Sequence, residues 1–210
     1  MALDEALLES GPFRQRPVLR FYGWTEPAAS FGYFQKYSEV KQSTSLRPLV
    51  RRPTAGGIVP HDADWTYSLM FPPTHEWYEL SARESYCRVH KWIQEAFATL
   101  ELGTELAPTQ LKTIAGQCFV GHEEADLLWH GRKIAGAAQR RRKDGLLIQG
   151  SVQPPICSLK RRDWEQAMLE TARILDKGEW QELELDPPLG QRASELAQLK
   201  YSQAAYNERR

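Results

Sequence analysis

A lysine flanked by small residues is the first feature of this 210-residue chain with chemical potential. Lys133 lies between Gly131 and Gly136, in the short apolar stretch KIAGAA. Glycine lets the backbone come close to a ligand, so that an ammonium group and backbone N–H groups approach one carbonyl or phosphate oxygen together. Lys133, Gly136 and Ala137 are therefore candidate ligand contacts.

A second candidate site is the segment RRPTAGGIVPHD at residues 51–62. Arg51 and Arg52 precede a turn of small residues, and Gly56 and Gly57 permit positive φ angles and close approach of backbone N–H groups to an anion. The apolar pair that follows predicts a loop leading into a strand. A single Gly-Gly pair is usually an ordinary hairpin turn. Two such loops in one chain favour a ligand site.

Composition and charge narrow the class of protein. With 41% hydrophobic and 10% aromatic residues, the chain is long enough to bury a sizeable core as one domain. Basic and acidic residues number 27 each, so no net charge would recruit nucleic acid or a membrane surface. The absence of a stretch of about eighteen apolar residues and of a secretion signal predicts a cytoplasmic protein.

Three widely spaced cysteines argue against a disulfide framework or a zinc site, since no CxxC pair occurs. Cys87 and Cys157 are most simply packing residues. Cys118 differs because it lies between Gly116 and Gly121, in a predicted loop ahead of Lys133. That setting favours an accessible thiol.

The pattern of apolar residues and turn formers predicts an α+β domain. Strands are expected near residues 18–23, 49–52, 66–71, 126–130, 133–140 and 146–152. The sequence WHGR at 129–132 predicts a hairpin turn between two of them.

Three helices are expected from spacing and caps. Ser81 and Glu84 form a capping-box signature for a helix that ends near Gly103. A second helix fits 163–177, with Asp163 as N-cap and Gly178 as stop. After a linker at 186–190, residues 194–207 predict a third helix that carries Leu196, Leu199 and Tyr206.

Together these segments resemble the superfamily of lipoate–protein ligases, biotin ligases and octanoyltransferases. Its members share an Arg-Arg-x-Ser/Thr-Gly-Gly-Gly loop followed by His-Asp, and a Lys-Ile/Val-x-Gly-x-Ala-Gln strand; this chain has RRPTAGG, His61-Asp62 and KIAGAAQ. Trp24, FGYFQ, QGSV and YSQAAYNERR extend the resemblance over most of the chain. It implies a class II aminoacyl-tRNA synthetase/biotin–lipoyl ligase-like domain over residues 1–210, a mixed β-sheet flanked by helices, with 186–190 linking to a C-terminal helix.

Four features favour an octanoyltransferase over an ATP-dependent ligase. Cys118 occupies a position resembling the nucleophile of cysteine-using octanoyltransferases, and HDADWTYS matches the compact form of that branch. Ala125-Asp126 stands where ligases commonly have Asn-Asp. The chain also leaves little room for the accessory C-terminal domain of bacterial ligases.

The resemblance implies Cys118 and Lys133 as catalytic residues. The thiolate would take octanoate from octanoyl-acyl carrier protein and pass it to a lysine of a lipoyl domain of a 2-oxoacid dehydrogenase or of the glycine-cleavage H protein. Substrate contacts are expected from Arg51, Arg52, Thr54, Gly56, Gly57, His61, Gly136, Ala137, Gln139 and Gly150. This route implies no metal, no bound cofactor and no nucleic-acid or membrane partner.

Several roles stay open at this point. Backbone N–H groups at Gly56, Gly57 and Gly136 would hold the oxyanion, while His61 is either a proton shuttle or, as we prefer, structural. The arginine pair is expected to shape the loop or meet a carrier phosphate. The run RRRK at 140–143 is either a solvated strand end or a contact for an acidic carrier.

Two alternatives remain beside the transferase. A ligase would use Lys133 to contact an acyl-adenylate, require ATP and Mg²⁺, and tolerate loss of Cys118. A noncatalytic protein that binds an acyl group or a carrier would fit the departures from the family pattern. These are Ala55 in place of the first loop glycine, Ile148 in place of His or Gln, and Tyr206 in place of Trp.

Overall fold

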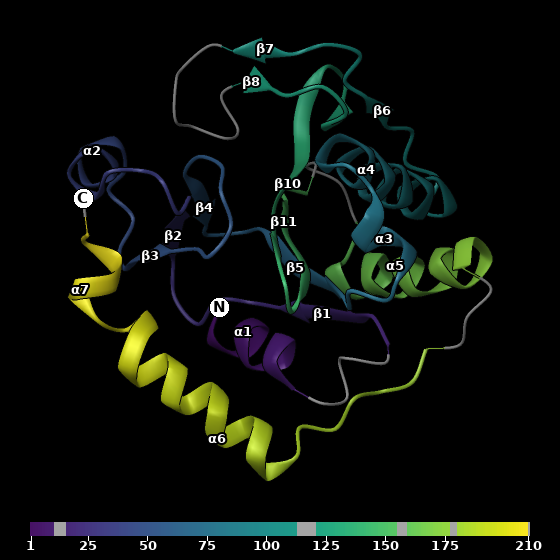
Figure 1. Ribbon diagram of the computed structural model, residues 1–210. Coiled ribbons are helices and arrows are strands. Elements are labelled where there is room, and N and C mark those ends of the chain that lie inside the picture. Colours follow the sequence, from purple (N-terminus) through teal and green to yellow (C-terminus); the bar gives the residue numbers. More distant parts are fainter. Residues whose placement is uncertain (11–15, 113–120, 155–158, 177–179, 210) are drawn as a thin grey trace.

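A computed structural model describes residues 1–10, 16–112, 121–154, 159–176 and 180–209 of the chain (Figure 1). Among these residues, six strands form one antiparallel sheet in the order β1-β5-β11-β10-β9-β6. Their bounds are Val18–Tyr22 (β1), Trp65–Phe71 (β5), Gly145–Val152 (β11), Arg132–Arg142 (β10), Leu127–Trp129 (β9) and Glu105–Leu106 (β6). All predicted strands are present. Five of them lie in this sheet, and Leu49–Arg51 lies in a second, smaller sheet.

The second sheet holds the parallel pairing that makes the fold mixed. Strand β2 (Ala28–Phe31) pairs in parallel with β3 (Leu49–Arg51) and antiparallel with β4 (Val59–His61). Helix α2 (Tyr37–Ser43) contributes Val40 to a small core with this sheet. A short pair, β7 (Leu111–Lys112) with β8 (Gly121–His122), completes the strands described.

The central strands β5 and β11 are buried along their whole length, because helices and the second sheet cover the two faces of the large sheet (Figure 1). Helices α4 (Ala82–Thr99) and α5 (Arg161–Asp176), with the short α3 (Glu76–Glu79), pack on one face. Helices α1 (Ala2–Glu9) and α6 (Pro187–Leu196) bury Leu7, Leu189 and Leu196 in a second core with Met70 and Leu147. No helix within the described ranges is long and apolar enough to span a membrane.

Two features predicted from short sequence motifs, a helix cap and a hairpin turn, are present in the structure. The capping box of α4 is present, because Ser81 Oγ accepts from Glu84 N at 3.2 Å and the Glu84 carboxylate accepts from Ser81 N at 2.8 Å. The hairpin turn between β9 and β10 is also present. His130 and Gly131 have φ angles of 49° and 72°, as a two-residue type I′ turn requires.

The C-terminal helices differ from the prediction. Helix α5 begins at Arg161, so Asp163 lies in its first turn and is not the N-cap, and Gly178 lies outside the described residues. The predicted linker at 186–190 is the start of α6: Asp186 caps it by accepting from Leu189 N at 2.9 Å, and prolines are tolerated in a first turn.

The helix predicted for 194–207 is also interrupted. A π-helical turn, Ala197–Tyr201, follows α6, and the chain then continues into α7 (Ala204–Asn207). Leu199 lies within this turn and is 77% exposed. Tyr206 is buried as expected.

Candidate active site

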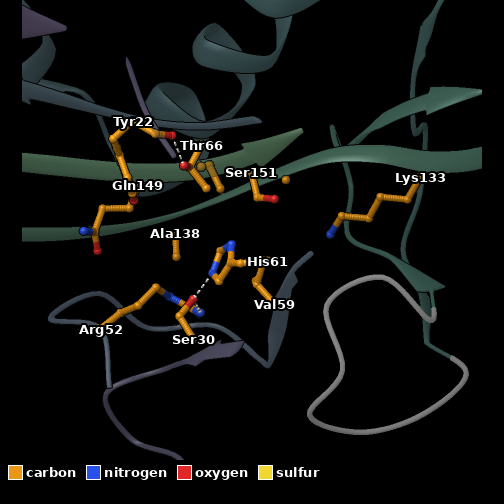
Figure 2. A pocket seen from close by; sticks show the side chains of 13 residues that line it. Tyr22, Ser30, Arg52, Val59, His61, Thr66, Lys133, Ala138, Gln149 and Ser151 are labelled. Atoms are coloured by element: carbon orange, nitrogen blue, oxygen red, sulfur yellow. Dashed lines mark hydrogen bonds between the residues drawn. The ribbon is translucent and has the colours of Figure 1, made fainter. Parts of the chain in front are cut away.

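A narrow cleft, partly open to solvent, lies between the large sheet and the small one (Figure 2). Its described lining residues are Tyr22, Ser30, Arg52, Val59, His61, Thr66, Lys133, Gly136, Ala137, Ala138, Gln149, Gly150 and Ser151. Small residues of β10 and β11 make one wall between the longer side chains of Lys133 and Gln149. Six of the expected site residues, Arg52, His61, Lys133, Gly136, Ala137 and Gly150, meet in this cleft.

Lys133 lies at one end of the cleft, far from Gln149 and Arg52 at the other (Figure 2). Its Nζ forms an ion pair with Asp126 Oδ2 at 2.7 Å, and the side chain is only 7% exposed. The lysine tip folds over Gly136, where an added Cβ would stand 2.8 Å from Nζ. Glycine at 136 is therefore needed for the position of the ammonium group, not for an unusual φ.

The carboxylate of Asp126 is itself held by its neighbours. It accepts a hydrogen bond from the Tyr86 hydroxyl of α4 and one from Glu123 N at 2.6 Å. Burial and the charge of Asp126 raise the pKa of Tyr86 well above its ordinary value, so the phenol stays a donor. A buried and fully oriented ion pair of this kind fixes a positive charge at the cleft.

His90, next to Tyr86, is expected to make the stability of the fold depend on pH. Its Nδ1 lies 2.9 Å from Tyr86 O, and burial lowers its pKa from 6.5 to about 4. The unfolded chain binds a proton below pH 6.5 that the folded chain binds only near 4, so stability falls as the pH falls through this window. We expect urea unfolding to give a free energy about 2–3 kcal/mol lower at pH 4.5 than at pH 7 from this group.

The test variant is His90→Gln. Its matched control is His130→Asn, which changes an exposed histidine. His90→Gln should lose that part of the pH slope, whereas His130→Asn should keep it. An unchanged slope in His90→Gln would show that other groups cause the acid sensitivity.

Arg52 and His61 belong to one buried hydrogen-bonded chain. Arg52 Nη1 donates to Ser30 Oγ at 2.8 Å, and Ser30 Oγ lies 2.6 Å from His61 Nε2. His61 Nδ1 lies 2.7 Å from Asp64 Oδ2, which also accepts from Ser151 Oγ at 2.6 Å. Trp24 stacks on the His61 ring, with centroids 4.1 Å apart. Since both ring nitrogens have partners, this geometry supports a structural role for His61.

The glycine-containing loop wraps around the Arg52 guanidinium. Arg52 Nη2 donates to the carbonyls of Ala55 and Gly57, at 3.1 and 2.8 Å. Gly56 has a φ of 90°, whereas the φ angle of Ala55 is not positive. Alanine in place of the first family glycine is therefore tolerated by the backbone here.

The remaining expected contacts lie outside the lining of the cleft. Arg51 is buried against the C-terminal segment and donates to five backbone carbonyls, of Tyr33, Gln35, Tyr206, Asn207 and Arg209. Gln139 faces α4, where it bonds Ser85 and the Ala82 carbonyl. Thr54, Gly56 and Gly57 lie in the loop beside the cleft without lining it. Cys118 lies outside the described residues.

The basic run is largely bound to the protein itself. Arg140 donates to Pro53 O at 2.8 Å, Arg141 donates to Leu80 O at 2.6 Å, and Arg142 lies 3.6 Å from Glu5 Oε1. Arg141 and Lys143 remain exposed.

Several lining residues were missed from sequence: Tyr22, Ser30, Val59, Thr66, Ala138, Gln149 and Ser151. Four of them lie within segments that resemble the family, which were the available signal: Gln149 and Ser151 in QGSV, Ala138 in KIAGAAQ and Thr66 in HDADWTYS. Gly150, between Gln149 and Ser151, packs against a buried ring, because an added Cβ would lie 2.1 Å from Tyr67 Cζ. Only a residue without a side chain fits there.

Comparison with known proteins agrees with this geometry. Octanoyltransferase LipM of Carboxydothermus hydrogenoformans is 37% identical over 158 residues, and LipM of Bacillus subtilis is 35% identical over 165. Each match covers 72% of this chain and 59% of the relative. The match therefore spans about three fifths of the length of these curated relatives.

Solved structures show the same fold. A lipoate-protein ligase A bound with ATP covers 99% of this chain and 92% of its own, with a TM-score of 0.80 and 20% identity. A bipartite lipoate protein ligase of Thermoplasma acidophilum covers 99% and 89%, with a TM-score of 0.74 and 18% identity. The family model of the lipoyl protein ligase A/B catalytic domain matches residues 1–153. The fold and the cleft that ends at Lys133 agree with this match. The chain therefore belongs to the lipoyl protein ligase A/B catalytic domain family.

Proposed function

We propose that the chain is an octanoyltransferase, which moves octanoate from acyl carrier protein through a cysteine thioester to a lysine of a lipoyl domain or of the glycine-cleavage H protein. The observation that carries the proposal is the buried ammonium of Lys133 at the end of a cleft walled by small residues. Similarity to LipM octanoyltransferases over 72% of the chain supports it.

The first half reaction uses the charge of Lys133. The thiolate of Cys118 attacks the carbonyl carbon of octanoyl-acyl carrier protein, and the negative charge that develops on the carbonyl oxygen is stabilised by the lysine ammonium. The tetrahedral intermediate collapses, the phosphopantetheine thiolate leaves, and the octanoyl group remains on the cysteine sulfur. Asp126 and Tyr86 act by holding the ammonium in place.

The second half reaction transfers the acyl group to nitrogen. The neutral amine of the target lysine attacks the thioester, the Cys118 thiolate leaves, and the amine nitrogen loses its proton to solvent or to a base. The backbone N–H group of Gly136, beside Lys133, is a candidate donor to the oxyanion in both steps. Gly56 and Gly57, also expected as donors, belong to the loop that is bonded to Arg52 and Gln149 at the other end of the cleft. The small residues Ala137 and Ala138 leave space for the alkyl chain.

Dependence on ATP is the experiment that tests this function. We would incubate the chain with octanoyl-acyl carrier protein and an unmodified lipoyl domain without ATP, and follow octanoylation of the domain by mass. The transferase predicts octanoylation without nucleotide. Octanoylation only from free octanoate with ATP and Mg²⁺ would identify a ligase, and carrier binding without product would identify a binding protein.

A further inference from the structure

Asp4 of α1 is a buried carboxylate directly beneath the acyl cleft. It is fully buried, and its Oδ1 accepts from Arg20 Nε and from Ser68 Oγ, both at 2.8 Å. Its Oδ2 accepts from Gln149 Nε2 at 2.8 Å. Burial alone would raise the pKa of Asp4, but the positive charges of the amino terminus and Arg20 and the Ser68 hydrogen bond hold it below its ordinary value. The carboxylate therefore stays ionised and accepts from all three side chains.

Gln149 connects this carboxylate to the cleft, which it lines at the end opposite Lys133 (Figure 2). Its Nε2 donates toward Asp4, and its Oε1 accepts from Thr54 Oγ1 at 2.9 Å. An amide offers donors on one side and an acceptor on the other, so these two contacts fix a single orientation of the side chain. The Asp4 carboxylate can only accept, so a reversed amide would set oxygen against oxygen there, whereas the Thr54 hydroxyl could accept as well as donate.

Thr54 is the far end of this connection and belongs to the loop that carries Gly56 and Gly57. Its side chain is buried, and its carbonyl accepts from Tyr33 N at 2.9 Å. The Arg52 guanidinium also holds this loop, because its Nη2 donates to the carbonyls of Ala55 and Gly57. The hydrogen bond from Thr54 to Gln149 thus joins the loop to β11 of the large sheet, beside the bond that Arg140 of β10 donates to Pro53 O.

We propose that Asp4 is a positioning residue for acyl transfer, which acts through Gln149 and Thr54 to fix the loop at residues 54–57 beside the cleft. The inference rests on the proposed function, and it assigns to α1 a part in binding the acyl donor. Asp4 itself touches no substrate. If the role were only structural, removal of any partner of Asp4 would lower stability without a separate effect on the loop.

Two matched variants separate these roles. Thr54→Val removes the last hydrogen bond and leaves Asp4 with its partners, whereas Ser68→Ala removes a donor to the same carboxylate on a residue that does not line the cleft. In the ATP-free assay we expect Thr54→Val to raise KM for octanoyl-acyl carrier protein about 3- to 10-fold, the size of one net hydrogen bond, with kcat within about twofold. Ser68→Ala should leave KM unchanged.

An exchange of partners gives a second test. Gln149→Glu alone places two buried carboxylates together, and Asp4→Asn alone lets the amide at 149 turn, so each should raise KM. The double variant Asp4→Asn/Gln149→Glu restores one amide and one carboxylate, and Thr54 again has an acceptor. Its KM should return toward the value of the unaltered chain.

Hydrogen exchange at residues 52–58 measures the loop without reference to activity. Exchange should be faster in Thr54→Val and Asp4→Asn than in the unaltered chain and in Ser68→Ala. Equal exchange in all four proteins would overturn the inference whether or not the chain transfers octanoate. If the unaltered chain transfers no octanoate but the exchange differences are present, the proposed function fails while the positioning of the loop stands.

Discussion

Lys133→Met is expected to lower kcat for octanoyl transfer about 10²- to 10³-fold, the usual effect of removing one oxyanion donor. Methionine keeps the length of the side chain and removes the ammonium that pairs with Asp126 at 2.7 Å. Transfer from octanoyl-acyl carrier protein to a lipoyl domain measures the change. The control Lys143→Met alters an exposed lysine after β10 and should retain full activity. Activity of Lys133→Met within tenfold of the unaltered chain would remove this lysine from the mechanism.

A second variant separates chemistry from folding. Lys133→Met leaves the buried Asp126 carboxylate without its cation, and loss of one partner of a buried pair typically costs about 3–5 kcal/mol. Lys133→Met/Asp126→Asn removes both charges, so urea unfolding should show that much of this loss is recovered. Because the ammonium is still absent, kcat should stay low. Recovery of activity together with stability would mean that the lysine served only the fold.

Arg51→Met is expected to lower the free energy of unfolding by at least ~3 kcal/mol, because each buried group left without a partner costs about 1–3 kcal/mol. Its guanidinium donates to carbonyls from two segments far apart in sequence, around Tyr33 and around Asn207. It also lies over the Phe31 ring, with Cζ 4.6 Å from the centroid. Equilibrium unfolding in urea gives the change in free energy.

Arg47→Met is the matched control. Arg47 also donates to backbone carbonyls, of Lys41, Thr44 and Leu46, but it does so at the surface. Water replaces lost surface hydrogen bonds, so the expected change is below about 1 kcal/mol. Similar losses in the two variants would mean that burial of Arg51 contributes little to its effect.

The parts of the fold that could be predicted depend on neighbours in sequence. The capping box at Ser81 and the turn at His130 and Gly131 are complete within four residues, so their signals are local. The strand of Lys133 and the segment of Arg52 were also recognised from their residues as candidate ligand sites, and both line the cleft. The sequence alone did not establish that they face one cleft, although the family resemblance implied it.

The features that were not predicted depend on tertiary contacts. Helix α1 has only eight residues, and the burial of Asp4 within it depends on Arg20, Ser68 and Gln149 from three strands. A charged residue near a chain end predicts exposure, so no pattern revealed this position. The π turn after Leu196 likewise has no sequence signature that we recognise, and Leu199 within it is exposed.

Adjacent arginines illustrate why the site could be predicted only in part. Arg51 is the last residue of β3, and Arg52 follows it, so alternation along the chain directs their side chains to opposite sides. One side leads to the cleft and Ser30, and the other to the C-terminal segment. The residue types favoured an anion contact for both, whereas the direction of each side chain was set by a sheet that joins distant segments.

The proposed transfer passes through a thioester on Cys118, which intact-protein mass would detect. The chain and its Cys118→Ala variant would each be mixed with octanoyl-acyl carrier protein in the absence of ATP. We expect that the unaltered chain gains the mass of one octanoyl group, that hydroxylamine removes it, and that the variant gains none. An unmodified chain that nevertheless octanoylates a lipoyl domain, or an adduct that persists in Cys118→Ala, would contradict the thioester route.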